Sequence, residues 1–310
     1  MEVAWISGAA AAVAAAASLA GMMLVRGTTA VPAAAWAVAA WSSLAGEMLI
    51  RAGGGLVDPG TAASARLAVA AVSLCPAMSL LGAKRPQHGV WQFIVATLFV
   101  VLILPVGPAL VAFPGSLPGV HLLAKWFMVA LSVVGWMNFI ATGRGLAATL
   151  VTVGQIILMR PFLPGFTMAD QIDGVIQNPS IDCAAACLAA MGTLLAAGQG
   201  WLAGALACRS EDDSGVHPLK AIIDPPFRAL RETLGAAWAL RVAERFDQIA
   251  AARGWPCRLS FGGLSVDGAG PDPAWQRDAW RAFAALMRRF VTVEWLRRHG
   301  GPRTAQRSGA

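Results

Sequence analysis

The chain has 310 residues, of which 57% are hydrophobic and 13% are charged, whereas roughly 25% of the residues of an average soluble domain are charged. This deficit argues against an ordinary cytosolic protein. The first 208 residues hold 8 basic and 6 acidic residues, about 7% of that part, and the last 102 hold 16 basic and 11 acidic ones, about 26%. The step predicts a transmembrane helix bundle over residues 1–208 and a water-exposed region after it.

The net charge of +7 comes almost wholly from arginine, because Lys84, Lys125 and Lys220 are the only lysines. No basic run carries a nucleic-acid recognition motif, so we expect no nucleic acid as a partner. A basic tail beside a membrane is instead expected to meet anionic lipid headgroups. The lipid bilayer is therefore the first expected partner.

Seven stretches are apolar over about the 20 residues that a helix needs to cross a bilayer core of about 30 Å, or nearly so. The first is rich in alanine, which is nearly neutral for insertion, so we expect it to pack closely on its neighbours through its small face. Pro105 and Pro108 fall at the end of the fourth, where proline kinks or ends a helix. Six spans, or a broken fourth span, are the alternatives to seven. The stretches are residues 3–25, 30–50, 62–83, 90–112, 120–142, 145–162 and 183–206.

The first stretch also has one feature of a signal peptide, because Ser18-Leu19-Ala20 is a passable cleavage site. However, the residues before its apolar core include Glu2 and no lysine or arginine, which is the wrong charge for a signal peptide. We therefore interpret it as a span.

Cations in the connections predict the orientation. With seven spans, one set of connections holds Arg26, Lys84, Arg85, Arg144 and the arginine-rich tail, and the other set holds two arginines, at positions 51 and 160. Because cytoplasmic loops carry an excess of lysine and arginine, the N-terminus is expected outside and the C-terminus in the cytoplasm. The expected location is the bacterial inner membrane.

Ionisable side chains inside spans cost about 3 kcal/mol each at a helix centre, so each is a functional hypothesis. Glu47 lies near the outer end of the second span, Arg66 near the outer start of the third, and His121 and Lys125 at the outer start of the fifth. One acid facing several bases at one depth predicts an ion pair between Glu47 and Arg66 that tethers two spans. There are two alternatives. The basic side chains extend to the membrane surface without a specific partner, or the residues form an outward-facing site for a small anion or lipid headgroup.

No catalytic residue, cofactor or metal is predicted. The Walker, zinc-protease and nucleophile-elbow motifs are missing, and the histidines are not placed to hold a haem between spans. Cys183 and Cys187 stand four residues apart without a nearby histidine or third cysteine, which favours packing over a zinc site. Asp170, Asp173 and Asp182, before the seventh span, do not have the spacing of a calcium loop, so that segment is expected to be solvated or interfacial.

In the tail, residues 209–223 predict a connector, because they carry an acidic cluster and a glycine. Asp224-Pro225-Pro226 then supplies an N-cap and prolines for a first turn, which starts a helix. Apolar residues follow at steps of three and four as far as Ile249, and Gly254 ends the pattern. This pattern predicts one amphipathic helix of about six turns.

Residues 258–266 alternate apolar and polar residues around Gly262-Gly263, which predicts a short β-hairpin. A second amphipathic helix is predicted from Pro273 to His299. The two helices either bury their apolar stripes against each other or lay one stripe on the membrane surface with its arginines towards lipid phosphates. The pattern leaves this choice open.

The predicted fold class is all-α: a polytopic membrane helix bundle of about seven spans, with a small, mainly helical cytoplasmic module over residues 224–299. Residues 300–310 are expected to be a disordered tail. The tail helices are also the expected docking site for a protein partner.

Three segments resemble an uncharacterised family of multi-span membrane proteins from planctomycete-type bacteria. They are LGAKRPQHGVWQFIVATLFVVLILPVGPAL, from Leu81 to Leu110, and the tail segments FRALRETLGAAWALRVAERF and RRFVTVEWLRRHG. The resemblance covers most of the chain. It implies no substrate, cofactor or catalytic residue, and implies only that the tail belongs with the membrane part.

Three functions fit these observations. The first is a non-catalytic inner-membrane scaffold or accessory subunit, because recognisable chemistry is missing beside a well-formed amphipathic tail. The second is a small transporter or channel that uses Glu47, Arg66 and Lys125, which predicts a water-accessible cavity among spans two, three and five. The third is a membrane-embedded enzyme, which predicts a facing set of acids, bases or metal ligands in the bundle.

Overall fold

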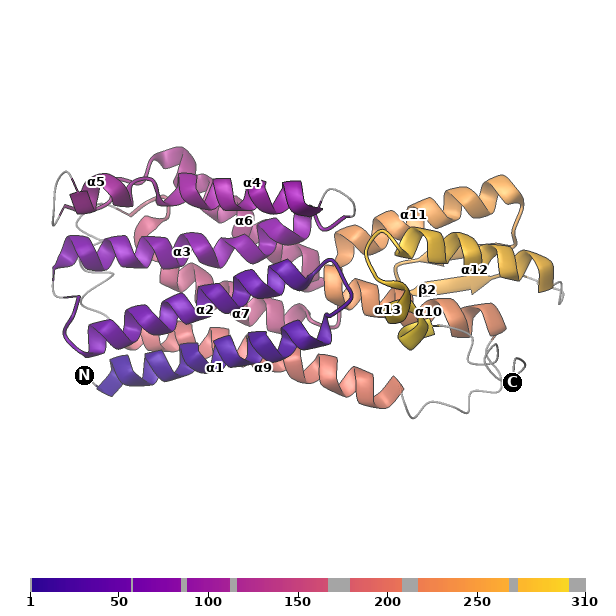
Figure 1. Cartoon of the computed structure of the whole chain (residues 1–310), viewed down its shortest axis with the longest axis horizontal. Coiled ribbons are helices and arrows are strands. Elements are labelled where there is room, and N and C mark those ends of the chain that lie inside the picture. Colours follow the sequence, from indigo (N-terminus) through magenta and orange to yellow (C-terminus); the bar gives the residue numbers. More distant parts are fainter. Residues whose placement is uncertain are drawn as a thin grey trace.

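The protein consists of a bundle of long helices and a smaller, mainly helical module that sits against one end of the bundle (Figure 1). The N-terminus lies at the end of the bundle that is remote from the module. The computed structural model describes residues 2–56, 58–84, 88–111, 116–166, 179–207, 217–267 and 273–300.

The bundle is formed by the first two thirds of the chain, and its long helices run back and forth along one axis (Figure 1). The helices are α1 (Glu2–Leu24), α2 (Val31–Ala52), α3 (Pro59–Leu81), α4 (His88–Ile103), α5 (Val106–Val111), α6 (Leu122–Ile140), α7 (Gly145–Met159), the 3₁₀ turn η1 (Arg160–Phe162) and α9 (Pro179–Ala207). The all-α fold class of the polytopic membrane type is confirmed.

Six helices of the described chain are long and apolar enough to cross a membrane, namely α1, α2, α3, α6, α7 extended by η1, and α9. The fourth predicted span is shorter, because α4 ends at Ile103 and α5 begins at Val106, on either side of Pro105. With 16 residues and a rise of 1.5 Å per residue, α4 is about 24 Å long, which is less than the bilayer core. The alternative of a broken fourth span is therefore the one that the structure has.

Helix α1 packs through small residues, as its alanine-rich sequence predicts. Its buried positions are Ser7, Gly8, Ala11, Ala14 and Ala17, and it lies against α2 and α9. A Cβ atom at Gly8 would come within 3.0 Å of Leu49 Cδ2. The close approach of α1 to α2 therefore depends on the missing side chain.

Helix α3 is the central helix of the bundle. In its apolar window 61% of the residues are buried, against 39% or less in the other candidate spans. Two apolar clusters meet on it. One joins α3 to α4, α6 and η1, through residues such as Leu74, Met128 and Phe162. The other includes α3 through Val69 and joins α1, α2, α7 and α9. A polar residue on α3 is therefore surrounded by protein.

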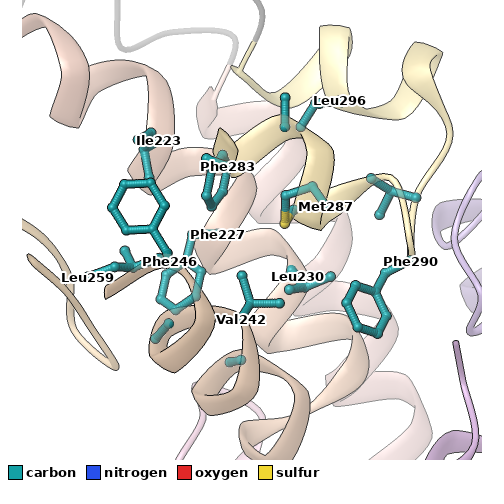
Figure 2. Close-up of a cluster of buried hydrophobic side chains, with 14 of the residues drawn as sticks. Ile223, Phe227, Leu230, Val242, Phe246, Leu259, Phe283, Met287, Phe290 and Leu296 are labelled. Atoms are coloured by element: carbon teal, nitrogen blue, oxygen red, sulfur yellow. The ribbon is translucent and has the colours of Figure 1, made fainter. Parts of the chain in front are cut away.

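The module has its own apolar core (Figure 2). Its elements are α10 (Pro218–Leu234), α11 (Ala236–Arg253), β1 (Cys257–Ser260), β2 (Gly263–Val266), α12 (Pro273–Met287) and α13 (Val293–Gly300). Phe227 of α10, Phe246 of α11 and Phe283 of α12 are fully buried in this core. The amphipathic tail helices thus bury their stripes against one another, the first of the two alternatives.

The predicted hairpin is present and is held by two carboxylates. Strands β1 and β2 are antiparallel, with Leu259 opposite Leu264. The backbone N–H of Leu264 donates to Asp224 Oδ1 over 2.7 Å, and that of Leu259 donates to Asp247 Oδ1 over 2.6 Å. Since Ser260 pairs with Gly263, the turn is Phe261-Gly262, one residue earlier than predicted.

The helix boundaries of the module differ from the prediction at three places. Helix α10 begins at Pro218 and not at Asp224, because His217 Nδ1 accepts from the N–H of Leu219 and caps an earlier start. Gly235 divides the predicted six-turn helix into α10 and α11, and residues 288–292 divide the next one into α12 and α13. Thus, of the predicted connector, residues 218–223 are helix and His217 is the N-cap. Residues 209–216 and the tail after Gly300 lie outside the described residues.

The module is joined to the bundle by backbone pairing. The N–H of Thr29, in the turn between α1 and α2, donates to Phe290 O over 2.8 Å. The N–H of Thr292 donates to Gly27 O over 2.7 Å, so Thr28 and Val291 form an antiparallel bridge. Trp238 Nε1 also donates to Leu80 O, at the end of α3, over 2.8 Å.

A second contact lies between α6 and the α10–α11 junction. Asn138 Nδ2 donates to Leu234 O over 2.9 Å, and its Oδ1 accepts from the N–H of Ala237 over 3.0 Å. Gly235 has φ of 87° and leaves no room for a Cβ atom next to Asn138. Both the left-handed backbone and the contact therefore require glycine here.

Candidate functional site: a buried ionic network

Four charged side chains from three helices meet in the half of the bundle that is remote from the module. The local sequence of α2 brings the first two together, because Glu47 and Arg51 are four residues apart and lie on one face near the C-terminal end of the helix. Arg51 Nη2 donates to Glu47 Oε1 over 2.5 Å. An arginine in the last turn of a helix also interacts favourably with the helix dipole.

Arg66, on the central helix α3, is fully buried, with 0% of its surface exposed. Its Nε donates to both carboxylate oxygens of Glu47, each over 2.9 Å. Its Nη1 and Nη2 donate to the two oxygens of Asp182, over 3.0 and 2.9 Å. The planar guanidinium thus forms a bidentate pair with one acid while its Nε holds the other.

Asp182 lies in the first turn of α9, where the positive end of the helix dipole favours a carboxylate. Arg51 Nη1 approaches Asp182 Oδ2 at 3.7 Å. Each acid is therefore paired with both arginines, and the four formal charges sum to zero. The network connects α2 and α3 to α9, and Asp182 lies 116 residues after Arg66 in the chain.

The predicted site residues fall into two groups. Glu47 and Arg66 form the ion pair that the sequence predicts, at 2.9 Å. His121 and Lys125 stand apart from it: His121 Nδ1 accepts from the N–H of Leu123 and caps α6, and Lys125 Nζ donates to Phe166 O over 3.1 Å. The structure therefore brings Glu47 and Arg66 together, whereas His121 contacts the start of its own helix and Lys125 contacts the segment after η1.

The sequence does not identify Asp182 as a site residue, because the segment before the seventh span is predicted to be solvated or interfacial. That prediction is wrong for Asp182, which is 3% exposed, while Asp170 and Asp173 lie outside the described residues. The available signal was its position, one residue before that span and at the same end of the bundle as Glu47 and Arg66. Two arginines and one acid at one depth leave a positive charge uncompensated, and Asp182 is an acid that can supply the balance.

The network leaves little room for acid–base chemistry or ligand binding. The side chains of Glu47, Arg66 and Asp182 are 4% exposed or less, and both carboxylates are already occupied by guanidinium groups. Arginine does not release a proton in proteins. Within the described residues, no group of three or more His, Cys, Asp or Glu could hold a metal ion.

A cavity of about 290 Å³ lies elsewhere in the bundle, between α2, α3, α6, α7 and α9. It extends from Trp41 and Gln155 to Asn138 and Arg144, which are at the module end. Neither Glu47 nor Arg66 nor Asp182 lines it. The ionic network and the cavity are therefore separate features.

The fold and the site together define a polytopic membrane-type helix bundle with an internal ionic clamp and a docked helical module. Comparison with protein families, with curated proteins and with solved structures gave no match to this chain. The resemblance to a planctomycete-type membrane family therefore stays a prediction.

Proposed function

We propose that this protein is a non-catalytic scaffold or accessory subunit of the bacterial inner membrane, with its N-terminus outside and its module in the cytoplasm. The observation that carries the proposal is the attachment of the module. Backbone pairing between residues 27–29 and 290–292, a core that includes Ala30 and Ala83, and the contact of Asn138 with the α10–α11 junction fix the module on the bundle.

A fixed attachment supports a scaffold because it defines the position of a docking surface relative to the membrane. A module on a flexible tether could still capture a partner, but it would not orient the partner. Here the module is already ordered before any partner binds, so binding loses less conformational entropy. This favours affinity for a partner of matching shape.

The orientation is supported by the distribution of cations along the bundle. Arg26 and Lys84, in connections between helices, and Arg144, at the start of α7, lie at the module end, which also carries the arginines of the module. The connections at the other end hold Arg51 and Arg160, and Arg51 is bound into the network. Because lysine and arginine are enriched on the cytoplasmic side of membrane proteins, this distribution supports a cytoplasmic module end.

The ionic network supports a structural role in this proposal. The transporter alternative needs water to reach Glu47, Arg66 and Lys125, and the first two are sealed in a neutral network while the third is outside it. The enzyme alternative needs a facing set of acids and bases. The network is such a set, but each of its acids is held by arginines and none lines the cavity.

Native mass spectrometry of the full chain, extracted in mild detergent through a C-terminal tag, tests the proposal. We expect a second protein in fixed stoichiometry. Gly235→Ala, which removes the fit between the α10–α11 junction and Asn138, is expected to lower the bound fraction, and Gly198→Ala, at a position with open space around it, is the matched control. A chain that never carries a protein, or a partner retained equally by both variants, would contradict the proposal.

A further inference from the structure

The cavity at the module end exists because small side chains face it from several helices. Ala77 of α3, Gly135 of α6 and Ala148 of α7 are among them. Large side chains at these positions would fill the space. Its volume of about 290 Å³ is close to the lower limit of about 300 Å³ for small-molecule pockets.

The walls of the cavity offer few free hydrogen-bonding groups. Gln155 Nε2 donates to the backbone oxygen and the Oγ of Ser73, over 2.9 and 3.0 Å. Ser132 Oγ donates to Met128 O, and Thr193 Oγ1 donates to Ala189 O, both over 3.0 Å. Since these donors are already used by the helices, an occupant of this part of the cavity must be apolar along its length.

One end of the cavity is positively charged. Arg144 lines the cavity and precedes the first residue of α7, and its Nη2 lies beside Gly200 of α9. Among the described residues no carboxylate forms an ion pair with it. The acid whose charge acts on it is Glu232, and that carboxylate is itself paired with Arg231 over 3.0 Å.

We propose that this cavity binds the acyl chain of an amphiphile whose anionic headgroup is held by Arg144. The cavity lies among helices that are long and apolar enough to cross a membrane. In a bilayer such helices are surrounded by lipid, so a hydrocarbon chain is the apolar occupant that the surroundings supply. The charged end lies at the module end of the bundle, where lipid headgroups are found, and basic pockets between transmembrane helices on the cytoplasmic side bind such headgroups. An anionic phospholipid and a free fatty acid share this chemistry.

Photocrosslinking of the full chain in lipid nanodiscs tests the site. The probes are phosphatidylglycerol, phosphatidylcholine and palmitate, each with a diazirine on the acyl chain, and the labelled peptides are mapped by mass spectrometry. We expect phosphatidylglycerol or palmitate to label the cavity-lining faces of α6 and α7. Labelling by the phospholipid identifies a leaflet lipid, and labelling by palmitate alone identifies a free fatty acid.

Two pairs of variants test the geometry. Ala148→Phe fills the cavity and is expected to abolish the labelling, whereas Leu146→Phe, on the exposed face of the same helix, leaves it unchanged. Arg144→Gln is expected to lower labelling by the anionic probe about fivefold, which is the change in affinity that the loss of one arginine near a lipid surface produces. Arg26→Gln, at an exposed position of the same end, is its control.

A competition experiment on the unmodified chain requires no substitution, so a folding defect cannot obscure it. Unlabelled phosphatidylglycerol is expected to displace the anionic probe more effectively than unlabelled phosphatidylcholine. Equal labelling by neutral and anionic lipids would overturn the role of Arg144. Equal effects of Ala148→Phe and Leu146→Phe would overturn the cavity as the binding site.

Discussion

Arg66 is the residue on which the packing of the bundle depends most directly. Its guanidinium holds an acid from α2 and an acid from α9 at once, and it is fully buried. Removing one partner from a buried ionic network is far more damaging than replacing the whole network, because the remaining charges are left unpaired.

Arg66→Met is therefore expected to destabilise the folded chain by about 3–5 kcal/mol, the cost of leaving buried charges uncompensated. Arg26→Met, at an exposed site, is expected to change the free energy of unfolding by less than about 0.5 kcal/mol. Unfolding of the detergent-solubilised chain gives both values. Equal stability of the two variants would show that the network does not hold the helices together.

Glu47→Arg and Arg66→Glu are each expected to lower expression, and the double reversal that combines them is expected not to restore it. In an isolated pair the double reversal would restore the attraction. Here Arg51 and Asp182 belong to the same network, so the reversal places two bases next to each other on α2 and makes an acid on α3 face the acid on α9. Expression in membranes measures the outcome. Full rescue would mean that Glu47 and Arg66 act as a pair without Asp182.

His299, in α13, gives the module a pH dependence. Burial lowers the pKa of His299 below its usual value of 6.5, and the neighbouring charge of Arg298 acts in the same direction, against a hydrogen bond to Trp295 O. Above pH 6.5 the histidine is neutral in the folded and the unfolded chain and contributes nothing. As the pH falls below 6.5, the unfolded chain binds the proton more readily, so folding loses stability.

The melting temperatures of the full chain and of His299→Gln, compared at pH 8 and pH 5, test this expectation. Both chains lose some stability in acid through their carboxylates, but the unmodified chain is expected to lose more. Parallel losses in the two chains would show that His299 titrates freely in the folded protein.

At the scale of residues, the sequence predicts the ion pair between Glu47 and Arg66 but not that Arg51 and Asp182 join it. Glu47 and Arg66 could be matched because each lies inside an apolar span, where an unpaired charge is costly. His121 and Lys125 lie at a helix start, where the histidine caps its own helix and the lysine donates to a backbone oxygen of the segment after η1. Depth alone does not distinguish these two situations.

Among the elements, the hairpin depends on Gly263, which the sequence predicts as part of the turn and which is the first residue of β2. Gly263 has φ of 133°, and a Cβ atom there would lie 2.9 Å from the carboxylate oxygens of Asp224. The same carboxylate accepts from the N–H of Leu264. A side chain at Gly263 would therefore strain the backbone and displace a buried acid.

Gly263→Ala is expected to destabilise the module by about 1–3 kcal/mol, the usual cost of a residue held in such a backbone region. Gly262→Ala is the matched control, because its Cβ atom would meet nothing closer than 3.7 Å. Hydrogen exchange at the amides of Leu259 and Leu264 reports the loss. Equal exchange in both variants would contradict the role assigned to Gly263.

The element boundaries show what a periodic pattern conveys. The apolar stripes correctly predict that the tail is helical and amphipathic, and Pro105 correctly marks the break between α4 and α5. The division at Gly235 could not be predicted, because a single glycine is tolerated inside a helical pattern. The approach of Asn138, which also requires glycine at this position, is a contact with the bundle that the module's own pattern does not contain.

On the scale of the whole molecule, the central feature is that bundle and module form one body. Its core joins Ala30 and Ala83 of the bundle loops to the aromatic residues of the module. The change in charged-residue content after residue 208 predicts two regions with different solvents. It contains no information about which residues of the two regions contact each other. The pairing of residues 27–29 with 290–292 joins opposite ends of the chain through backbone atoms, which side-chain patterns do not record.

Disulfide cross-linking between Thr28→Cys and Val291→Cys in intact membranes tests the docked module most directly. The two positions form an antiparallel bridge, so their Cα atoms are about 4.5–5.5 Å apart, within the range of a disulfide. Rapid and complete oxidation, with the linked peptide found by mass spectrometry, is the predicted result. Thr28→Cys combined with Arg253→Cys, at the far end of α11, is the control and should not cross-link. If the Thr28–Val291 pair oxidises no faster than this control, the module is not docked on the bundle, and the scaffold proposal loses its basis.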